Sequence, residues 1–135
     1  MAEKALQLEV VTPERVVFKE KVDFVVAPGT EGSLGFLPGH VPLITSLEIG
    51  VVKYTKNGQQ RKIAISGGFL EIKNDKIVIL ANTAERDDEI DVERAKAAKA
   101  RAEQRLASRA PDIDLVRAEL ALKRALARLQ AAGHE

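Results

Sequence analysis

The chain has 135 residues, of which 45% are hydrophobic and 30% charged, and its formal net charge is +1. This size allows one hydrophobic core or two small ones, and the near-neutral charge argues against a simple nucleic-acid binder. The absence of cysteine excludes disulfides and thiolate metal sites, and the two histidines lie too far apart in sequence to favour a metal site. No apolar run approaches about 18 residues and the first residues do not match a signal peptide, so we expect a soluble protein that reaches a membrane only through partners.

The composition changes between residues 84 and 91. All five aromatic residues and eight of the nine glycines precede residue 70, whereas thirteen alanines follow residue 90. Residues 91–135 hold ten Lys and Arg against seven Asp and Glu, so positive charge is concentrated there. We therefore predict two domains, residues 1–84 and residues 85–135.

The first domain contains short β-branched and aromatic runs that are separated by turn-forming residues. Asn57-Gly58 is the strongest hairpin signal among them, and Gly67-Gly68 permits a tight bend. Because no helical pattern separates these runs, they predict an antiparallel sandwich or barrel rather than a parallel sheet. The expected strands cover residues 6–11, 16–18, 22–26, 33–37, 43–55, 61–66, 69–73 and 76–81.

No group of residues in this domain has the pattern of a catalytic site. Ser66 does not lie in a Gly-x-Ser-x-Gly elbow, and His40 has no carboxylate near it in sequence. The glycines between residues 29 and 39 fit neither a Walker A loop nor a dinucleotide fingerprint. We expect no catalytic residue, no metal site and no enzyme activity in the chain itself.

The sequence of the second domain predicts a hairpin of two helices. The first helix ends, and the second begins, around Ala110-Pro111-Asp112. Both runs consist mainly of strong helix formers, and aspartates crowd their starts, where helix caps and dipoles favour them. The second helix has a clear apolar stripe, but the corresponding face of the first is mostly alanine and buries little area. Because the hairpin is held weakly, we expect it to be mobile. The stripe consists of Leu115, Ala118, Leu122, Ala125, Leu126 and Leu129.

Each predicted helix also carries three arginines at spacings of seven and eleven residues. Steps of this size return to within about 20° of the starting direction, so the arginines form a stripe on each helix. Two interpretations remain open: solvated faces with i,i+4 ion pairs, or a seat for an anion or an acidic partner. The arginines are Arg94, Arg101 and Arg105, and Arg117, Arg124 and Arg128.

Several motifs resemble one known family over nearly the whole chain. The segment Gly32-Ser33-Leu34-Gly35-Phe36-Leu37-Pro38-Gly39-His40-Val41-Pro42-Leu43 is highly specific, and Thr12-Pro13, Ser66-Gly67-Gly68-Phe69 and Ala84-Glu85-Arg86 accompany it. Together they are similar to the epsilon subunit of bacterial F-type ATP synthases. Residues 118–125 are most similar to epsilon subunits of thermophilic bacilli.

This resemblance implies a ten-stranded antiparallel β-sandwich followed by two helices, located in the rotating central stalk beside the gamma subunit and on the c-ring. Such a subunit is peripheral, on the cytoplasmic side of the cell membrane. The hairpin of the family lies folded against the sandwich or extends along gamma, where its basic residues meet an acidic segment of the catalytic beta subunit, next to alpha, and inhibit ATP hydrolysis. We assign Arg105, Arg117 and Lys123 to that inhibitory contact.

Family members from bacilli also bind ATP through a motif that stands here as Ile90-Asp91-Val92-Glu93-Arg94-Ala95. Arginines offer forks of donors to phosphate oxygens, and Glu85 or Asp91 would accept from the adenine amino group or a ribose hydroxyl, or orient an arginine. Asp91 has a second interpretation as a helix N-cap, and Lys99 stands where close relatives have Arg. ATP is thus the expected regulatory ligand, with the role of Mg2+ left open. By resemblance the ATP-binding residues are Glu85, Ile90, Asp91, Arg94, Ala95, Arg101, Arg124 and Arg128.

Two other functions remain as alternatives. The first is the same stalk subunit without nucleotide sensing, in which the arginines serve only the acidic partner. The second is a nucleic-acid-binding module that uses the basic hairpin. No aromatic residue accompanies the arginines to stack on bases, which disfavours the second alternative.

Overall fold

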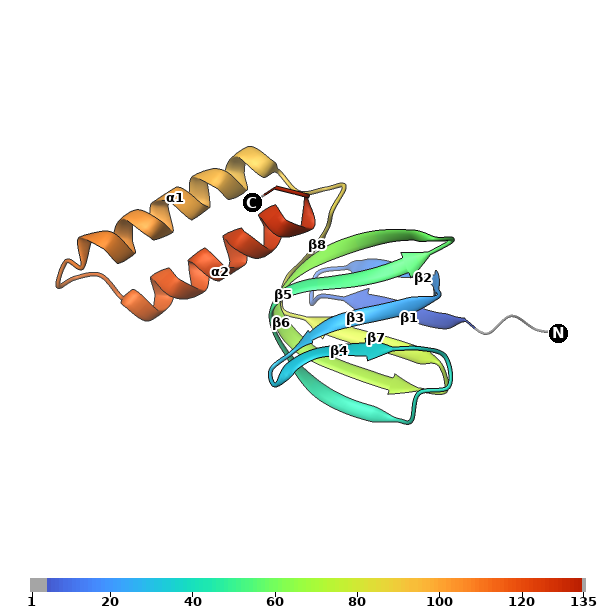
Figure 1. Cartoon of the computed structure of the whole chain (residues 1–135). Helices are drawn as coiled ribbons and strands as arrows, with labels where there is room; N and C mark the ends of the chain where they lie inside the picture. The colour runs from blue at the N-terminus through green and yellow to red at the C-terminus, as the bar shows by residue number, and fades with distance from the viewer. Residues whose placement is uncertain (1–4, 135) are drawn as a thin grey trace.

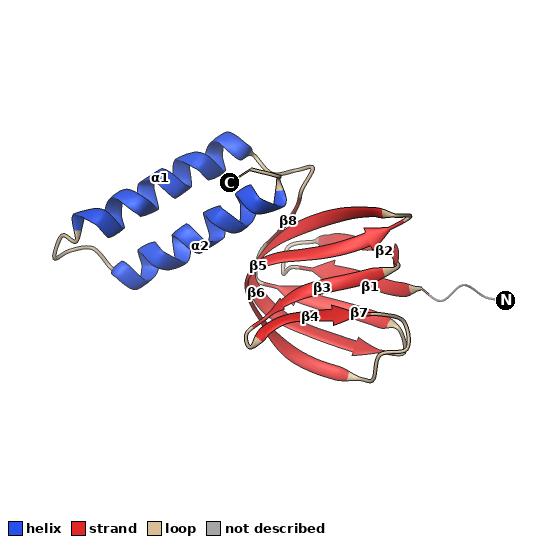
Figure 2. Cartoon of the chain, in the orientation of Figure 1, coloured by secondary structure: helices blue, strands red, loops and turns tan. Residues whose placement is uncertain are grey.

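The computed structural model describes residues 5–134, which form eight strands followed by two helices (Figures 1 and 2). The helical hairpin projects from one end of the β domain. The strands are β1 (Leu6–Val11), β2 (Val16–Val22), β3 (Phe24–Gly29), β4 (Gly32–Phe36), β5 (Leu43–Lys56), β6 (Gln59–Lys73), β7 (Lys76–Ala81) and β8 (Ala84–Arg86), and the helices are α1 (Val92–Ser108) and α2 (Leu115–Ala131).

The strands form one sheet, in the order β2-β1-β7-β6-β5-β3-β4, with β8 paired to β6. The sheet curls so that its two halves face each other across the core (Figure 1). Phe18 of β2 and Tyr54 of β5 illustrate this closure, because their ring centroids lie 4.5 Å apart although the two strands are not neighbours in the sheet. Apolar side chains fill the space between the layers, as the buried Leu6, Leu8 and Val10 of β1 show.

Two details differ from the expected antiparallel, ten-stranded sandwich. Strands β1 and β7 pair in parallel, which is possible because β2 to β6 provide the long crossover that parallel neighbours need. The described residues contain eight strands rather than ten, and β5 and β6 are unbroken over 14 and 15 residues. Along β6, residues 63–65 pair with β8 and residues 68–73 pair with β7.

Gly67-Gly68 does not end a strand as predicted, so the strands expected at 61–66 and 69–73 are one. Both glycines have positive φ angles, 95° and 146°. A Cβ atom on Gly68 would lie 2.1 Å from the carbonyl oxygen of Leu80 on β7. This glycine therefore permits the close approach of two strands within the curled sheet, rather than a turn.

The two helices begin where the aspartates predicted. Asp91 caps α1 and Asp114 caps α2, and each carboxylate accepts a hydrogen bond from the amide three residues later. Helix α2 packs against β5 and β6, and α1 lies on its outer side (Figure 1). Of the predicted apolar stripe, Leu115 and Leu126 are exposed, because alanines take the buried positions of the hairpin. Within residues 5–134, neither helix is both long and apolar enough to cross a membrane.

Candidate functional site

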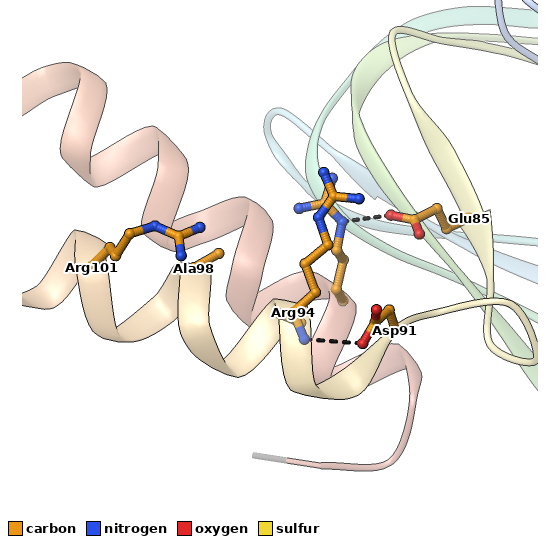
Figure 3. A pocket seen from close by; sticks show the side chains of 7 residues that line it. Glu85, Asp91, Arg94, Ala98 and Arg101 are labelled. Carbon is orange, nitrogen blue, oxygen red and sulfur yellow. Dashed lines mark hydrogen bonds and ion pairs between the residues drawn. The ribbon is translucent and has the colours of Figure 1, made fainter.

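A cavity of about 390 Å3 lies where the hairpin meets the end of the sheet (Figure 3). Strand β8 and helix α2 contribute one residue each, and α1 together with its N-cap contributes five. We call it the arginine cavity. Its lining residues are Glu85, Asp91, Arg94, Ala95, Ala98, Arg101 and Arg128.

The positions on α1 follow from the helix repeat. Arg94, Ala98 and Arg101 are separated by four and three residues, so all three lie on one face. In Figure 3 the Arg94 side chain rises from the first turn of α1 toward Glu85, while Arg101 lies further along the helix beyond Ala98. Alanine at positions 95 and 98 leaves the space between the two arginines open, and this space forms part of the cavity.

Asp91 closes the N-terminal end of the arginine cavity. Its backbone is extended, with φ −80° and ψ 99°, and its carboxylate accepts the amide of Arg94 at 3.0 Å. The prediction that Asp91 is the N-cap of α1 is thus confirmed, and the same side chain also lines the cavity. The free amides of the first helical turn add a partial positive charge at this end.

Arg128 is the one cavity arginine with a carboxylate partner among the described residues. Its Nε donates to Glu85 Oε1 at 2.5 Å, and the two side chains are each one-third exposed. In the part of the chain that the structure describes, Arg94 and Arg101 take part in no ion pair. Three arginines against two carboxylates leave a positive surplus around the cavity, which favours an anion.

Six of the eight residues expected to bind ATP surround this one cavity, and two do not. Ile90 is half-buried in a small apolar cluster with Val51, Ala64, Ala127 and Ala131. This cluster holds α2 on β5 and β6, so Ile90 supports the cavity from behind rather than lining it.

Arg124 is also half-buried, and it lies one turn before Arg128 on α2. It lines a small recess of about 10 Å3 that shares Glu85 and Arg128 with the arginine cavity. A change of side-chain rotamer would be needed to bring its guanidinium into the larger space. The structure therefore places Arg124 next to the cavity but not in it.

The three residues assigned to an inhibitory contact lie elsewhere. Arg105, Arg117 and Lys123 are exposed on the helices. Lys123 lines a separate groove of about 520 Å3 between α2 and the strands β5 and β6. None of the three lines the arginine cavity.

Two features of the site were not predicted: Ala98 as a lining residue, and the contacts that fix residues 87–91, the linker between β8 and α1. Asp87 accepts hydrogen bonds from Arg61 at 2.8 and 3.0 Å and from the Lys62 amide at 3.1 Å. The hydrogen bonds from Arg61 lower the pKa of Asp87, although burial opposes the shift. Ala98 could have been found from its spacing to Arg94 and Arg101, whereas the Arg61–Asp87 pairing carries no local sequence signal.

Glu89 is the second fixed point of the linker. Its carboxylate accepts hydrogen bonds from the Arg15 side chain at 2.6 Å and from the Arg86 amide at 2.9 Å. Burial tends to raise the pKa of Glu89, but these hydrogen bonds and the nearby arginine charges lower it overall. The linker is thus attached to the β domain up to Glu89, one residue before Ile90.

The fold and the cavity define a class of protein: a curled β-sandwich with an appended cationic helical hairpin and an arginine-lined cavity where the two meet. Two family models match consecutive parts of the chain. They are the ATP synthase delta/epsilon chain beta-sandwich domain, over residues 5–87, and the ATP synthase delta/epsilon chain long alpha-helix domain, over residues 88–133. The predicted division after residue 84 falls within β8, while the border between the two models follows that strand.

Individual relatives agree with the family models. The chain is 66% identical to an ATP synthase epsilon chain of Carboxydothermus hydrogenoformans, over 98% of both chains. It is 58% identical to an ATP synthase epsilon chain of Desulforamulus reducens, over 96% of this chain and 98% of the relative. The chain therefore belongs to the delta/epsilon family, as a bacterial F-type ATP synthase epsilon subunit, and is a non-catalytic subunit of that enzyme complex.

Two solved assemblies contain chains of the same fold. A chain of the Euglena gracilis mitochondrial ATP synthase OSCP/F1/c-ring assembly aligns with TM-score 0.81 and 26% identity, covering 98% of this chain and 83% of that chain. A chain from the central stalk and c-ring of the Tetrahymena thermophila mitochondrial ATP synthase aligns with TM-score 0.60 and 15% identity, covering 98% and 99%. The second likeness concerns the fold alone.

Proposed function

We propose that this epsilon subunit works in the central stalk of a proton-translocating F-type ATP synthase and inhibits ATP hydrolysis through its hairpin. In this proposal ATP binds in the arginine cavity and stabilises the hairpin against the sandwich. Hydrolysis is inhibited when ATP is scarce and the hairpin extends. The relatives named above and the Euglena assembly support the stalk role, and the cavity supports the ATP site.

The observation that carries the ATP proposal is the composition of the cavity walls. Its volume of about 390 Å3 lies within the usual range for small-molecule sites. The guanidinium groups of Arg94, Arg101 and Arg128 supply fixed forks of donors for phosphate oxygens. Because their mutual repulsion is only partly offset by Glu85 and Asp91, a triphosphate would relieve it.

In this proposal the hairpin has two states, docked on the sheet and extended. A ligand shifts an equilibrium only by its different affinity for the two states, and the cavity exists only where β8, α1 and α2 meet. Extension of the hairpin would separate Arg128 and the α1 residues from Glu85. ATP bound across these elements would therefore favour the docked hairpin.

The β domain has an exposed apolar surface suited to partner subunits. Phe69 on β6 and Leu80 on β7 are directly paired and are 60% and 57% exposed, and Ile44 on β5 is 69% exposed. Exposed apolar side chains gathered in this way mark interaction sites. We assign the sandwich to contacts with the gamma subunit and the c-ring, which would hold the protein peripherally at the cytoplasmic side of the cell membrane.

A second candidate function is the same stalk subunit without nucleotide sensing. Its support is that Arg105, Arg117 and Lys123 are exposed and lie outside the cavity. These side chains are available to an acidic segment of the beta subunit whether or not ATP binds. A nucleic-acid role is the weaker alternative, because the hairpin has no aromatic residue for base stacking.

Calorimetric titration of the isolated chain with ATP, and with ADP for comparison, tests the ATP site. We expect saturable one-to-one binding that prefers ATP. Arg94→Ala removes charged hydrogen bonds to phosphate and should weaken binding about tenfold or more. The combined change Asp91→Ala and Arg94→Ala should weaken it further, because the helix cap is lost as well.

The control for this titration is Lys96→Gln, which removes one positive charge from the exposed side of α1. It should leave the ATP affinity close to that of the wild type. An ATP affinity that is unchanged in the Arg94→Ala variant would contradict the assignment of the ATP site to the arginine cavity. If no heat of binding is detected at millimolar ATP, the stalk role still stands. The arginines would then be assigned to contacts with the partner subunit instead of ATP.

A further inference from the structure

Residues 32–47 form the longest stretch of the chain without Asp, Glu, Lys or Arg, although 30% of all residues are charged. The stretch includes β4, the loop of residues 37–42 and the start of β5. Leu37 and Val41 of this loop are 61% and 70% exposed, and the exposed Ile44 follows them on β5. Exposed apolar side chains gathered in an uncharged stretch indicate a surface that a partner covers.

A side chain from another turn of the sheet holds this loop. Asp75 lies between β6 and β7, and its Oδ1 accepts a hydrogen bond from the Gly39 amide at 2.6 Å. The backbone carbonyl of Asp75 accepts the Gln7 amide at 2.8 Å, so the turn is itself attached to β1. Within residues 5–134, no other hydrogen bond joins the loop to a distant part of the chain. Asp75 therefore acts as a brace for the loop.

The geometry of both turns makes this brace possible. Gly39 and Asp75 have positive φ angles of 88° and 61°, which glycine and aspartate adopt more readily than most residues. The negative charge of Asp75 strengthens the hydrogen bond, and the uncharged stretch contains no carboxylate that could replace it. The next residue, His40, packs edge-on against the buried Phe36, with ring centroids 4.9 Å apart. The middle of the loop is thus fixed, while the apolar side chains before and after it remain exposed.

We propose that Asp75 is a positioning residue for partner binding: it holds Leu37 and Val41 in the arrangement that an uncharged, apolar hollow of the gamma subunit receives. This inference rests on the proposed function and names a residue that prepares the assigned surface. A loop that is already fixed loses less conformational entropy when it binds, so the brace raises affinity without touching the partner. A ring repeats its surface around its axis, whereas two fixed anchors select a single position, so we assign the loop to gamma rather than to the c-ring.

Three substitutions in the β6–β7 turn separate the brace from the conformation of the turn. Asp75→Gly removes the acceptor and tolerates the positive φ angle. Asp75→Asn keeps an acceptor oxygen and also suits this conformation, so it should restore most of the brace. Asn74→Gly is the matched control, because Asn74 has a φ angle of 52° in the same turn and its side chain makes no hydrogen bond among the described residues.

Two measurements on the full chain follow the brace and the binding. Amide hydrogen exchange of Gly39 in the isolated protein reports the brace, and the affinity for a complex of the alpha, beta and gamma subunits reports docking. For Asp75→Gly we expect Gly39 to exchange about tenfold faster and the affinity to fall about three- to tenfold. Asn74→Gly should change neither quantity. ATP binding should be the same in all variants, because the turn lies at the end of the sandwich opposite the hairpin (Figure 1).

A double substitution distinguishes positioning from a general loss of stability. In a Val41→Ser background one anchor is already lost, so Asp75→Gly should cost less affinity than in the wild type. An equal loss in both backgrounds, or an unchanged affinity despite faster exchange of Gly39, would overturn the positioning role. Unchanged exchange of Gly39 would show that Asp75 does not hold the loop, and a loss of affinity that requires the c-ring would contradict the assignment to gamma. A wild-type chain that does not bind the gamma-containing complex would instead refute the proposed stalk role, before any variant is measured.

Discussion

The sandwich and the hairpin are stabilised by different kinds of side chain. The sandwich core contains large, fully buried residues such as Phe36, Ile63 and Ile72. The buried residues of α1 are only Ala95 and Ala102, and those of α2 are alanines together with Leu129. Since burial contributes about 25 cal/mol per Å2 of apolar surface, the hairpin gains far less from its contacts. We therefore expect that the hairpin can change position without unfolding the sandwich.

The border between these regions lies at Ile90. Asp87 and Glu89 are hydrogen-bonded to the β domain through Arg61 and Arg15, so the linker belongs to the sandwich up to that point. Ile90 packs in the small apolar cluster under α2. We therefore expect the hairpin to pivot after Glu89 and to withdraw Ile90 when it leaves.

The largest effect should come from the sandwich core. Phe36→Ala creates a cavity around a fully buried ring, so we expect the free energy of unfolding to fall by about 3–5 kcal/mol. Chemical denaturation followed by circular dichroism measures this loss. A loss below about 1 kcal/mol would contradict the view that the sandwich carries the stability of the chain.

A charge placed under the hairpin should separate the two regions. Ala127→Asp puts a carboxylate into the apolar cluster of Val51, Ala64 and Ala131, where burial of a charge is costly. We expect amide exchange of α2 to become at least about tenfold faster while the strands of the sandwich keep their protection. Ala97→Asp, on the exposed side of α1, is the control and should leave exchange unchanged. Equal acceleration in α2 and in the strands would mean that the two regions unfold as one unit.

The smallest effect should be a pH dependence of the linker. The folded pKa of Asp87 lies below its unfolded value of 3.8, so its ion pair with Arg61 stabilises the protein above about pH 4 and is lost as the pH falls through the folded pKa. Arg61 is 43% exposed, so we expect Arg61→Gln to lower stability by no more than about 1 kcal/mol at pH 7. The difference from the wild type should shrink as the pH falls through the folded pKa of Asp87, and a difference that stays constant over that fall would show that Asp87 is not its source.

Local patterns predicted most of the elements. Helix-forming composition and the aspartates gave both helices, and Asp91 and Asp114 are the observed caps. The parallel pairing of β1 with β7 was not predictable, because it joins segments that are far apart in sequence. The bend predicted at Gly67-Gly68 was wrong for a related reason. The constraint on Gly68 comes from the carbonyl of Leu80 on another strand.

The candidate site also has features that local sequence patterns predict and features that depend on contacts between distant segments. The motif and the helix repeat are local, so they predict that Asp91, Arg94, Ala95 and Arg101 lie near one another, whereas Glu85 and Arg128 were assigned to the site only by the resemblance. It did not reveal that Ile90 packs in the apolar cluster below α2, or that Arg124 lines a neighbouring recess. These outcomes depend on how α2 sits on the sheet, which no spacing within the helices determines.

Amide hydrogen exchange of α2 with and without ATP tests the central claim most directly. If ATP binds across the docked hairpin, exchange of residues 115–131 should slow with increasing ATP, by up to about a hundredfold at one hundred times Kd, while the core strands change little. ADP should protect α2 less. Identical exchange of α2 at saturating ATP and without ATP would contradict the claim that nucleotide stabilises the docked hairpin.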